Sequence, residues 1–102
     1  MGTLMKYLVL AFAALAITFN PAHAAEPTGE AMAATCAACH GTHGKLGTVE
    51  YMPLAGMAET EFVRAMQDFR SGKRLSTLMG HVANGFSDNE IRAMAKYFAT
   101  IK

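Results

Sequence analysis

Hydrophobic side chains recur with the period of an α-helix in the second half of the chain. Within residues 59–71, Phe62, Met66 and Phe69 are spaced by four and three residues, and charged residues lie between them. This spacing places the three side chains on one helix face. Gly72 follows directly and is a typical stop signal. We therefore predict an amphipathic helix over 59–71.

A second amphipathic pattern runs to the C-terminus. Ser87 and Glu90 stand at the spacing of a capping box, in which each side chain binds the backbone N–H of the other residue. One apolar face follows, made by Ile91, Met94, Ala95 and Phe98. We expect the final helix to begin at this box and to end near Thr100.

The remaining segments complete an all-α prediction. The alanine-rich stretch 29–35 favours helix, can be capped by Thr28, and leads to Cys36. Glycines and a proline interrupt residues 40–58 and predict a loop, whereas 75–86 fits a short helical turn or loop. No segment alternates with the period of a strand. Three main helices with loops this long suggest that the loops pack on a cofactor.

The first 24 residues have the features of an export signal. Lys6 precedes an apolar stretch over 8–19, and Ala22-His23-Ala24 forms an A-x-A cleavage site. The stretch is shorter than the roughly 20 residues of a membrane span, so no permanent anchor is expected. We predict a signal peptide over 1–24, one domain over 25–102, and a periplasmic location.

The size and the net charge of residues 25–102 limit which functions this domain can have. A domain of residues 25–102 is close to the size at which an apolar core alone is barely sufficient, so a buried cofactor would help it to fold. It contains eight basic and eight acidic residues, because Lys6 leaves with the signal. This balance argues against a nucleic-acid partner.

The chain contains one C-x-x-C-H motif, Cys36-Ala37-Ala38-Cys39-His40. This is the attachment signature of c-type haem. Residues three apart on a helical turn point the same way, so both thiols can form thioethers with the vinyl groups of one porphyrin. His40 then lies in place to be the proximal iron ligand. The motif therefore predicts a single covalent haem c.

Three other uses of a cysteine pair compete with haem attachment. A structural zinc site needs two further ligands at a second knuckle, and the chain has no other cysteine. A thioredoxin-like redox pair is expected beside a βαβ unit, for which no strand is predicted. A plain disulfide would leave His40 without a role. An export signal and a small helical domain also favour haem.

A six-coordinate haem needs a second axial ligand, commonly Met or His. Met32, Met66 and Met94 lie on predicted helices, where methionine usually fills the core. Three loop methionines remain as ligands: Met52, Met57 and Met79. Among the histidines, His81 is the rival ligand, and His43 follows the motif too closely to reach the opposite face of the haem, so we expect it to be exposed.

The chain as a whole resembles class I cytochrome c. The resemblance rests on the C-x-x-C-H motif, Pro53-Leu-Ala-Gly56, Phe69-Arg-Ser-Gly72, Met79 and the closing Tyr97-Phe98 helix. It implies the small all-α class I fold, with long loops around one haem and with Met79 as the distal ligand.

The same resemblance implies a residue that orients the proximal histidine. In the family, the carbonyl of the proline in a P-x-L-x-G segment accepts the ring N–H of that histidine. Pro53 is expected in this role, although the segment here is one residue shorter. Arg74 or Lys73 can pair with a haem propionate or form a solvated basic turn.

A narrower resemblance bears on the partner. The run from Phe69 to Ser87 is similar to the haem subunit of flavocytochrome c sulfide dehydrogenase, in which a flavoprotein oxidises sulfide and the haem subunit passes the electrons on. This chain has one attachment motif and would correspond to a single-haem subunit. The alternative is a free-standing electron carrier to a terminal oxidase or another respiratory or photosynthetic partner.

A different functional class is a haem-based sensor or a peroxidase-like enzyme. Either would need an open or easily vacated distal position on the iron. Met79 argues against both, so the chain is expected to transfer electrons and not to be an enzyme by itself.

Overall fold

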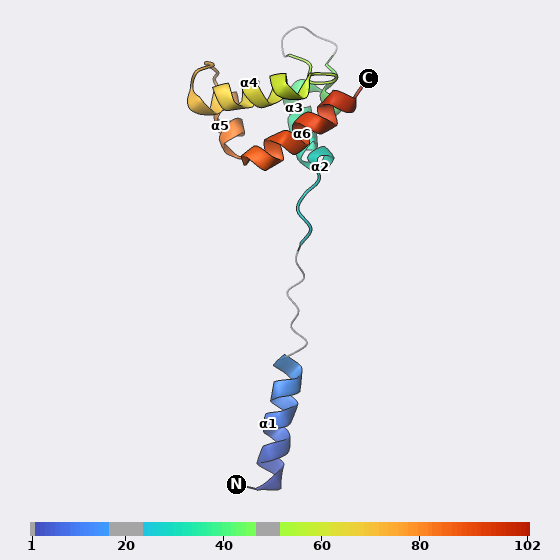
Figure 1. The fold of residues 1–102 in the computed structure, drawn as a ribbon, viewed down its shortest axis with the longest axis vertical. Coiled ribbons are helices and arrows are strands. Elements are labelled where there is room, and N and C mark those ends of the chain that lie inside the picture. Colours follow the sequence, from blue (N-terminus) through green and yellow to red (C-terminus); the bar gives the residue numbers. More distant parts are fainter. Residues whose placement is uncertain (1, 17–23, 47–51) are drawn as a thin grey trace.

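The computed structural model describes residues 2–16, 24–46 and 52–102, and the described part is built from helices and loops without a strand. Figure 1 shows α1 lying apart from the other helices. The α-helices are α1 (Thr3–Ala16), α2 (Gly29–Ala33), α3 (Ala37–His40), α4 (Glu59–Ser71), α5 (Met79–Asn84) and α6 (Asp88–Thr100), and two short 3-10 turns, η1 (Ala34–Cys36) and η2 (Thr42–Gly44), flank α3. The all-α prediction is confirmed.

The helical path through the cysteine motif is longer than the sequence suggested. Thr28 caps α2 as predicted, since its hydroxyl accepts a hydrogen bond from the Ala31 backbone N–H at 3.1 Å. Helical geometry then continues through η1 and α3 as far as His40. It ends at Gly41, whose φ of 84° is unfavourable for residues with a Cβ.

The two amphipathic helices have the predicted bounds. Gly72 ends α4 in the left-handed conformation with φ 77°. The capping box opens α6: Ser87 Oγ accepts from Glu90 N, and Glu90 Oε2 accepts from Ser87 N at 2.6 Å. Both signals are local in sequence, which is why they could be recognised without the tertiary structure.

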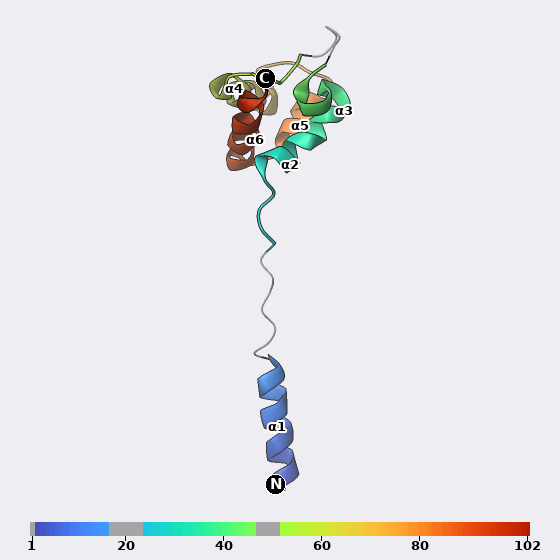
Figure 2. The ribbon, with the colours of Figure 1, turned by 90° about the vertical axis from the view of Figure 1, so that its right-hand side faces the viewer.

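The core lies where α2, α4 and α6 meet, and Figure 2 shows α2 crossing beside α6. Phe98 is fully buried, and its ring centroid lies 5.4 Å from that of Phe62. The predicted core methionines are also confirmed, because Met32, Met66 and Met94 are 7%, 4% and 0% exposed. Gly29 allows the crossing: a Cβ at this position would overlap the Ala93 carbonyl.

The short helix α5 packs against α4. Arg70 of α4 also forms hydrogen bonds with the segment that follows α5. The Arg70 guanidinium donates to Asp88 Oδ1 at 2.7 Å and to the Phe86 carbonyl at 2.8 Å. The helix α5 is thus held by its contacts with α4 and by the bonds that Arg70 makes just after it. Met79 is the first residue of α5, so these contacts also fix its position.

No helix in the described ranges has the length and apolar character needed to cross a membrane. Ala22 and His23 of the predicted cleavage site Ala22-His23-Ala24 lie outside the described residues, so cleavage after Ala24 stays a prediction.

Candidate functional site

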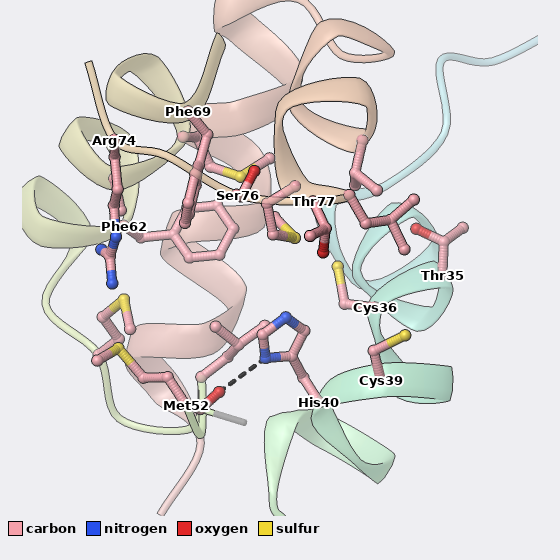
Figure 3. Close-up of a pocket in the computed structure, with 17 residues that line it drawn as sticks. Thr35, Cys36, Cys39, His40, Met52, Phe62, Phe69, Arg74, Ser76 and Thr77 are labelled. Atoms are coloured by element: carbon pink, nitrogen blue, oxygen red, sulfur yellow. Dashed lines mark hydrogen bonds between the residues drawn. The ribbon is translucent and has the colours of Figure 1, made fainter. Parts of the chain in front are cut away.

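A cavity of about 380 Å³ opens between the cysteine motif, α4 and α5 (Figure 3). Its volume is in the range of cofactor and small-molecule sites. Most of the walls are apolar. The apolar lining residues are Met52, Leu54, Met57, Phe62, Ala65, Met66, Phe69, Leu78, Met79 and Val82. Two of the core residues predicted from periodicity, Phe62 and Phe69, thus also face the cavity.

Cys36 and Cys39 lie together on the rim of this cavity. Cys36 ends η1 and Cys39 belongs to α3, and both line the cavity. The two residues are three positions apart on continuous helical backbone. Both are free thiols. Burial raises the pKa of the Cys36 thiol, a hydrogen bond with the Thr35 side chain opposes this, and the neighbouring Cys39 adds to the increase. In the cofactor-free chain Cys36 is therefore a neutral thiol at neutral pH.

His40 is held by a backbone carbonyl. Its Nδ1 lies 2.7 Å from the Met52 carbonyl oxygen. A carbonyl can only accept, so Nδ1 carries the proton and donates it, and Nε2 is the unprotonated nitrogen of the ring. Figure 3 shows this second nitrogen pointing into the cavity. The ring is thus oriented to bind a metal through Nε2.

The acceptor for His40 differs from the one expected. We predicted the Pro53 carbonyl, and the structure places the carbonyl of Met52 there, one residue earlier. The physical reason is register: counted back from Leu54 and Gly56, the first position of P-x-L-x-G falls on Met52. The carbonyl that meets His40 Nδ1 is therefore the one at the first position of this pattern, which Met52 and not Pro53 occupies.

The loop that contains the Met52 carbonyl forms backbone hydrogen bonds with two other elements. The backbone N–H groups of Leu54 and Ala55 both donate to the Gly44 carbonyl, at 2.9 and 3.2 Å. Gly56 N donates to the Phe98 carbonyl at 2.9 Å. The orientation of His40 is therefore coupled to η2 and to the end of α6.

The structure brings all three loop methionines to the cavity. Met52 belongs to the loop behind the His40 ring, and Met57 follows in the same loop. Met79 instead comes from α5, and Val82 lines the cavity one turn later. His81 is exposed and lies outside the lining.

His43 is exposed, as expected. It also has a partner that the sequence did not indicate. Its Nδ1 lies 2.6 Å from the Tyr97 hydroxyl of α6.

The sequence also left one cavity residue undecided. Arg74 lines the cavity. Lys73 instead pairs with Asp68, with 3.5 Å between Nζ and Oδ1. When two basic residues are adjacent in a turn, the sequence does not indicate which of them faces the cavity.

The residues present fit a covalently attached haem. Two thiols at the rim, an imidazole nitrogen aimed into the cavity, a thioether on α5 and apolar walls form the donor set of a c-type haem site. A structural zinc site needs four ligands. In the part of the chain that the structure describes, no three His, Cys, Asp or Glu residues gather to hold an ion.

Comparisons with known proteins agree with this geometry. A family model for cytochrome c matches residues 26–102. The cytochrome subunit of sulfide dehydrogenase from Chlorobaculum tepidum is 38% identical over 77 residues, which cover 74% of this chain and 68% of that protein.

Two other relatives differ in how much of their length is matched. Cytochrome c4 from Pseudomonas aeruginosa is 36% identical over 95% of this chain, which spans about half (49%) of that protein. Cytochrome c-553 from Helicobacter pylori is 34% identical over 96% of this chain and is covered in full.

Proposed function

This chain belongs to the cytochrome c family, and we propose that it serves as the haem subunit that takes electrons from a flavin-containing sulfide dehydrogenase subunit. Family membership and the single C-x-x-C-H motif make it a mono-haem electron carrier and not an enzyme. Its partners are other redox proteins. The identity of the electron donor is the part that we propose.

The site residues have distinct roles in this proposal. Cys36 and Cys39 would hold the haem through thioether bonds to its two vinyl groups, and His40 through Nε2 and Met79 through its sulfur would be the residues that ligate the iron. When bound, the haem iron supplies a one-electron oxidation and reduction. The Met52 carbonyl keeps the His40 ring in its ligating tautomer.

The apolar residues that line the cavity affect the oxidation and reduction of the iron without binding it. Phe62 and Met66 are almost fully buried and line the cavity. By keeping water from the metal, they disfavour the more highly charged ferric state relative to the ferrous state. Rigid walls also limit the reorganisation that accompanies each electron transfer.

The observation that carries the partner assignment is the relative from Chlorobaculum tepidum. It is named as the cytochrome subunit of sulfide dehydrogenase, and this chain covers 68% of it. The similarity of residues 69–87 to haem subunits of that enzyme class supports the same partner. This segment includes the turn after α4 and all of α5, which together form one side of the cavity.

The test is a purification without an affinity tag from cells that make both proteins. We expect flavin absorbance to co-elute with the haem, and sulfide to reduce the haem in the pooled fraction. A fraction incubated with the same sulfide concentration after the flavoprotein has been removed is the control, because sulfide can reduce haem directly. A haem monomer without flavin would rule out the subunit assignment.

A second function is favoured by the relative that is matched in full. Cytochrome c-553 is covered from end to end by an alignment that includes 96% of this chain. A free-standing soluble carrier would have this one-domain architecture. The flavin-free monomer of the previous experiment is the outcome that favours it.

We further propose export to the periplasm with cleavage after Ala24. The short apolar stretch and the A-x-A site support this proposal. Intact mass of the purified haem protein tests it, because the mature chain should begin at Ala25. A chain that still carries Met1 would contradict it.

A further inference from the structure

Arg74 is placed over the cavity by the turn that ends α4. Gly72 reverses the chain in the left-handed region, and the Arg74 backbone N–H then donates to the Asp68 carbonyl at 3.0 Å. This turn lays the guanidinium over the Phe69 ring, 4.8 Å from its centroid. The contact is a cation–π interaction, which holds the charged group against one wall of the cavity.

Arg74 brings a permanent positive charge to a wall that is otherwise apolar. Within the described lining it is the one residue that is charged at every pH of interest. Lys73 is directed elsewhere, because it lies outside the lining and its Nζ is 3.5 Å from Asp68 Oδ1. Among the described residues no carboxylate lies within ion-pair distance of Arg74. The Arg74 guanidinium is exposed and has no carboxylate partner among these residues, so it is available to an anionic group of a bound cofactor.

The cofactor carries its anionic groups on the side opposite to its attachment points. In a protoporphyrin the two vinyl groups lie on adjacent pyrroles, and the two propionates lie on the other two. Figure 3 shows Cys36 and Cys39 on one side of the cavity and Arg74 on the other, with His40 between them. A haem attached through both thiols thus presents its carboxylates toward Arg74.

We propose that Arg74 binds a haem propionate and is a cofactor-binding residue of this protein. A planar guanidinium can donate two parallel N–H bonds to one carboxylate, a geometry that an ammonium group lacks. Stacking on Phe69 positions the guanidinium before the haem is present. The pairing also keeps a positive charge near the iron. This inference depends on haem attachment and not on the identity of the electron donor.

The test compares three variants of the haem-loaded protein: Arg74→Gln, Arg74→Lys and, as the matched control, Lys73→Gln. Resonance Raman spectra report the propionate bending mode, and a redox titration at pH 8 gives the midpoint potential. In Arg74→Gln we expect the bending mode to shift and the potential to fall, because a nearby positive charge disfavours ferric iron. Arg74→Lys should keep most of the potential but still shift the mode.

Lys73→Gln should leave both the mode and the potential close to wild type. The proposal is overturned if Arg74→Gln leaves the bending mode unchanged, or if Lys73→Gln changes both quantities to the same extent. Retention of the ferric charge-transfer band near the red end of the visible spectrum shows that the iron ligands are intact in each variant. Should Arg74→Gln fail to take up haem, an unshifted mode in Arg74→Lys would likewise overturn it.

Discussion

Three loop methionines line the same cavity, and at the scale of single residues only their attachment distinguishes them. Met52 and Met57 belong to the loop whose carbonyl holds the His40 ring from behind. Met79 is the first residue of α5, an element separate from that loop. A ligand from a separate element can reach the iron from the side that His40 does not occupy, so we propose Met79 as the distal ligand.

Met79→Ala is therefore expected to abolish the weak ferric charge-transfer band near the red end of the visible spectrum. Loss of the thioether should also lower the midpoint potential, because a thioether ligand favours the ferrous state. Visible spectroscopy and a redox titration of the haem-loaded variant measure both effects.

Met57→Leu is the matched control, since it removes another cavity-lining sulfur while keeping the apolar volume. It should retain the band. A Met79→Ala protein that keeps the band, or a Met57→Leu protein that loses it, would show that the ligand has been assigned to the wrong residue.

At the scale of elements, the capping box of α6 makes stability depend on pH. Hydrogen bonds from Ser87 hold the pKa of Glu90 below the ordinary value of 4.5. The bond from the backbone N–H has the larger effect, and the bond with the hydroxyl has the smaller one. Because the folded pKa is the lower one, this stabilisation is fully present above about pH 4.5. It is lost as the pH falls through the folded pKa.

Glu90→Gln should therefore be less stable than wild type at pH 7, and the difference should shrink toward pH 3. Denaturant unfolding of the haem-loaded proteins at several pH values measures it. Glutamine keeps the carbonyl oxygen of the box, so the comparison isolates the charge. A difference that is the same at pH 7 and pH 3 would contradict this explanation.

The crossing of α2 and α6 depends on the absence of a side chain at Gly29. A methyl group there would overlap the Ala93 carbonyl, which is backbone and cannot turn aside. Overpacking of this kind costs about 1–3 kcal/mol. The gain in helix propensity on replacing glycine by alanine is at most about 1 kcal/mol in a helix interior and smaller at the first residue.

Gly29→Ala is thus expected to lower the free energy of unfolding by about 1–3 kcal/mol, measured by guanidinium titration of the haem-loaded protein. Glu30→Ala changes the next residue, which is exposed on the same helix, and should cost less than about 1 kcal/mol. Equal stability of wild type and Gly29→Ala would mean that the two helices can separate without penalty.

At the scale of the whole molecule, the haem forms part of the core. The buried residues cluster where α2, α4 and α6 meet, and the cavity beside them is walled by Phe62, Met66 and Leu54 from that same core. A domain the size of the matched residues 26–102 buries too little apolar surface to be very stable alone. Filling the cavity with a porphyrin extends the core.

The Cys36→Ala/Cys39→Ala double variant removes both attachment points and should unfold with a broad, weakly cooperative transition. Thermal unfolding followed by far-UV circular dichroism measures it. Each single variant keeps one thioether, and both are expected to be intermediate. A double variant that melts as sharply as wild type, at the same temperature and without haem, would show that the polypeptide core is sufficient.

Much of this molecule was predictable because the signals are local. The stop at Gly72 depends on one residue and its immediate neighbours, and the start at Ser87 and Glu90 depends on a single turn. The spacing of Cys36, Cys39 and His40 carries its own chemistry in five consecutive residues. Local steric and hydrogen-bonding preferences alone set these features, so the sequence by itself determined the helices and the haem motif.

Other features depend on where distant segments meet, and only the tertiary structure decided them. The carbonyl that holds His40 belongs to Met52 and not to Pro53, because the register of a loop is set by its bonds to Gly44 and Phe98. Arg74 and not Lys73 faces the cavity, because the turn after α4 directs one toward Phe69 and the other toward Asp68. A carbonyl direction or a side-chain direction in a loop reflects long-range contacts, and these leave no periodic pattern in the chain.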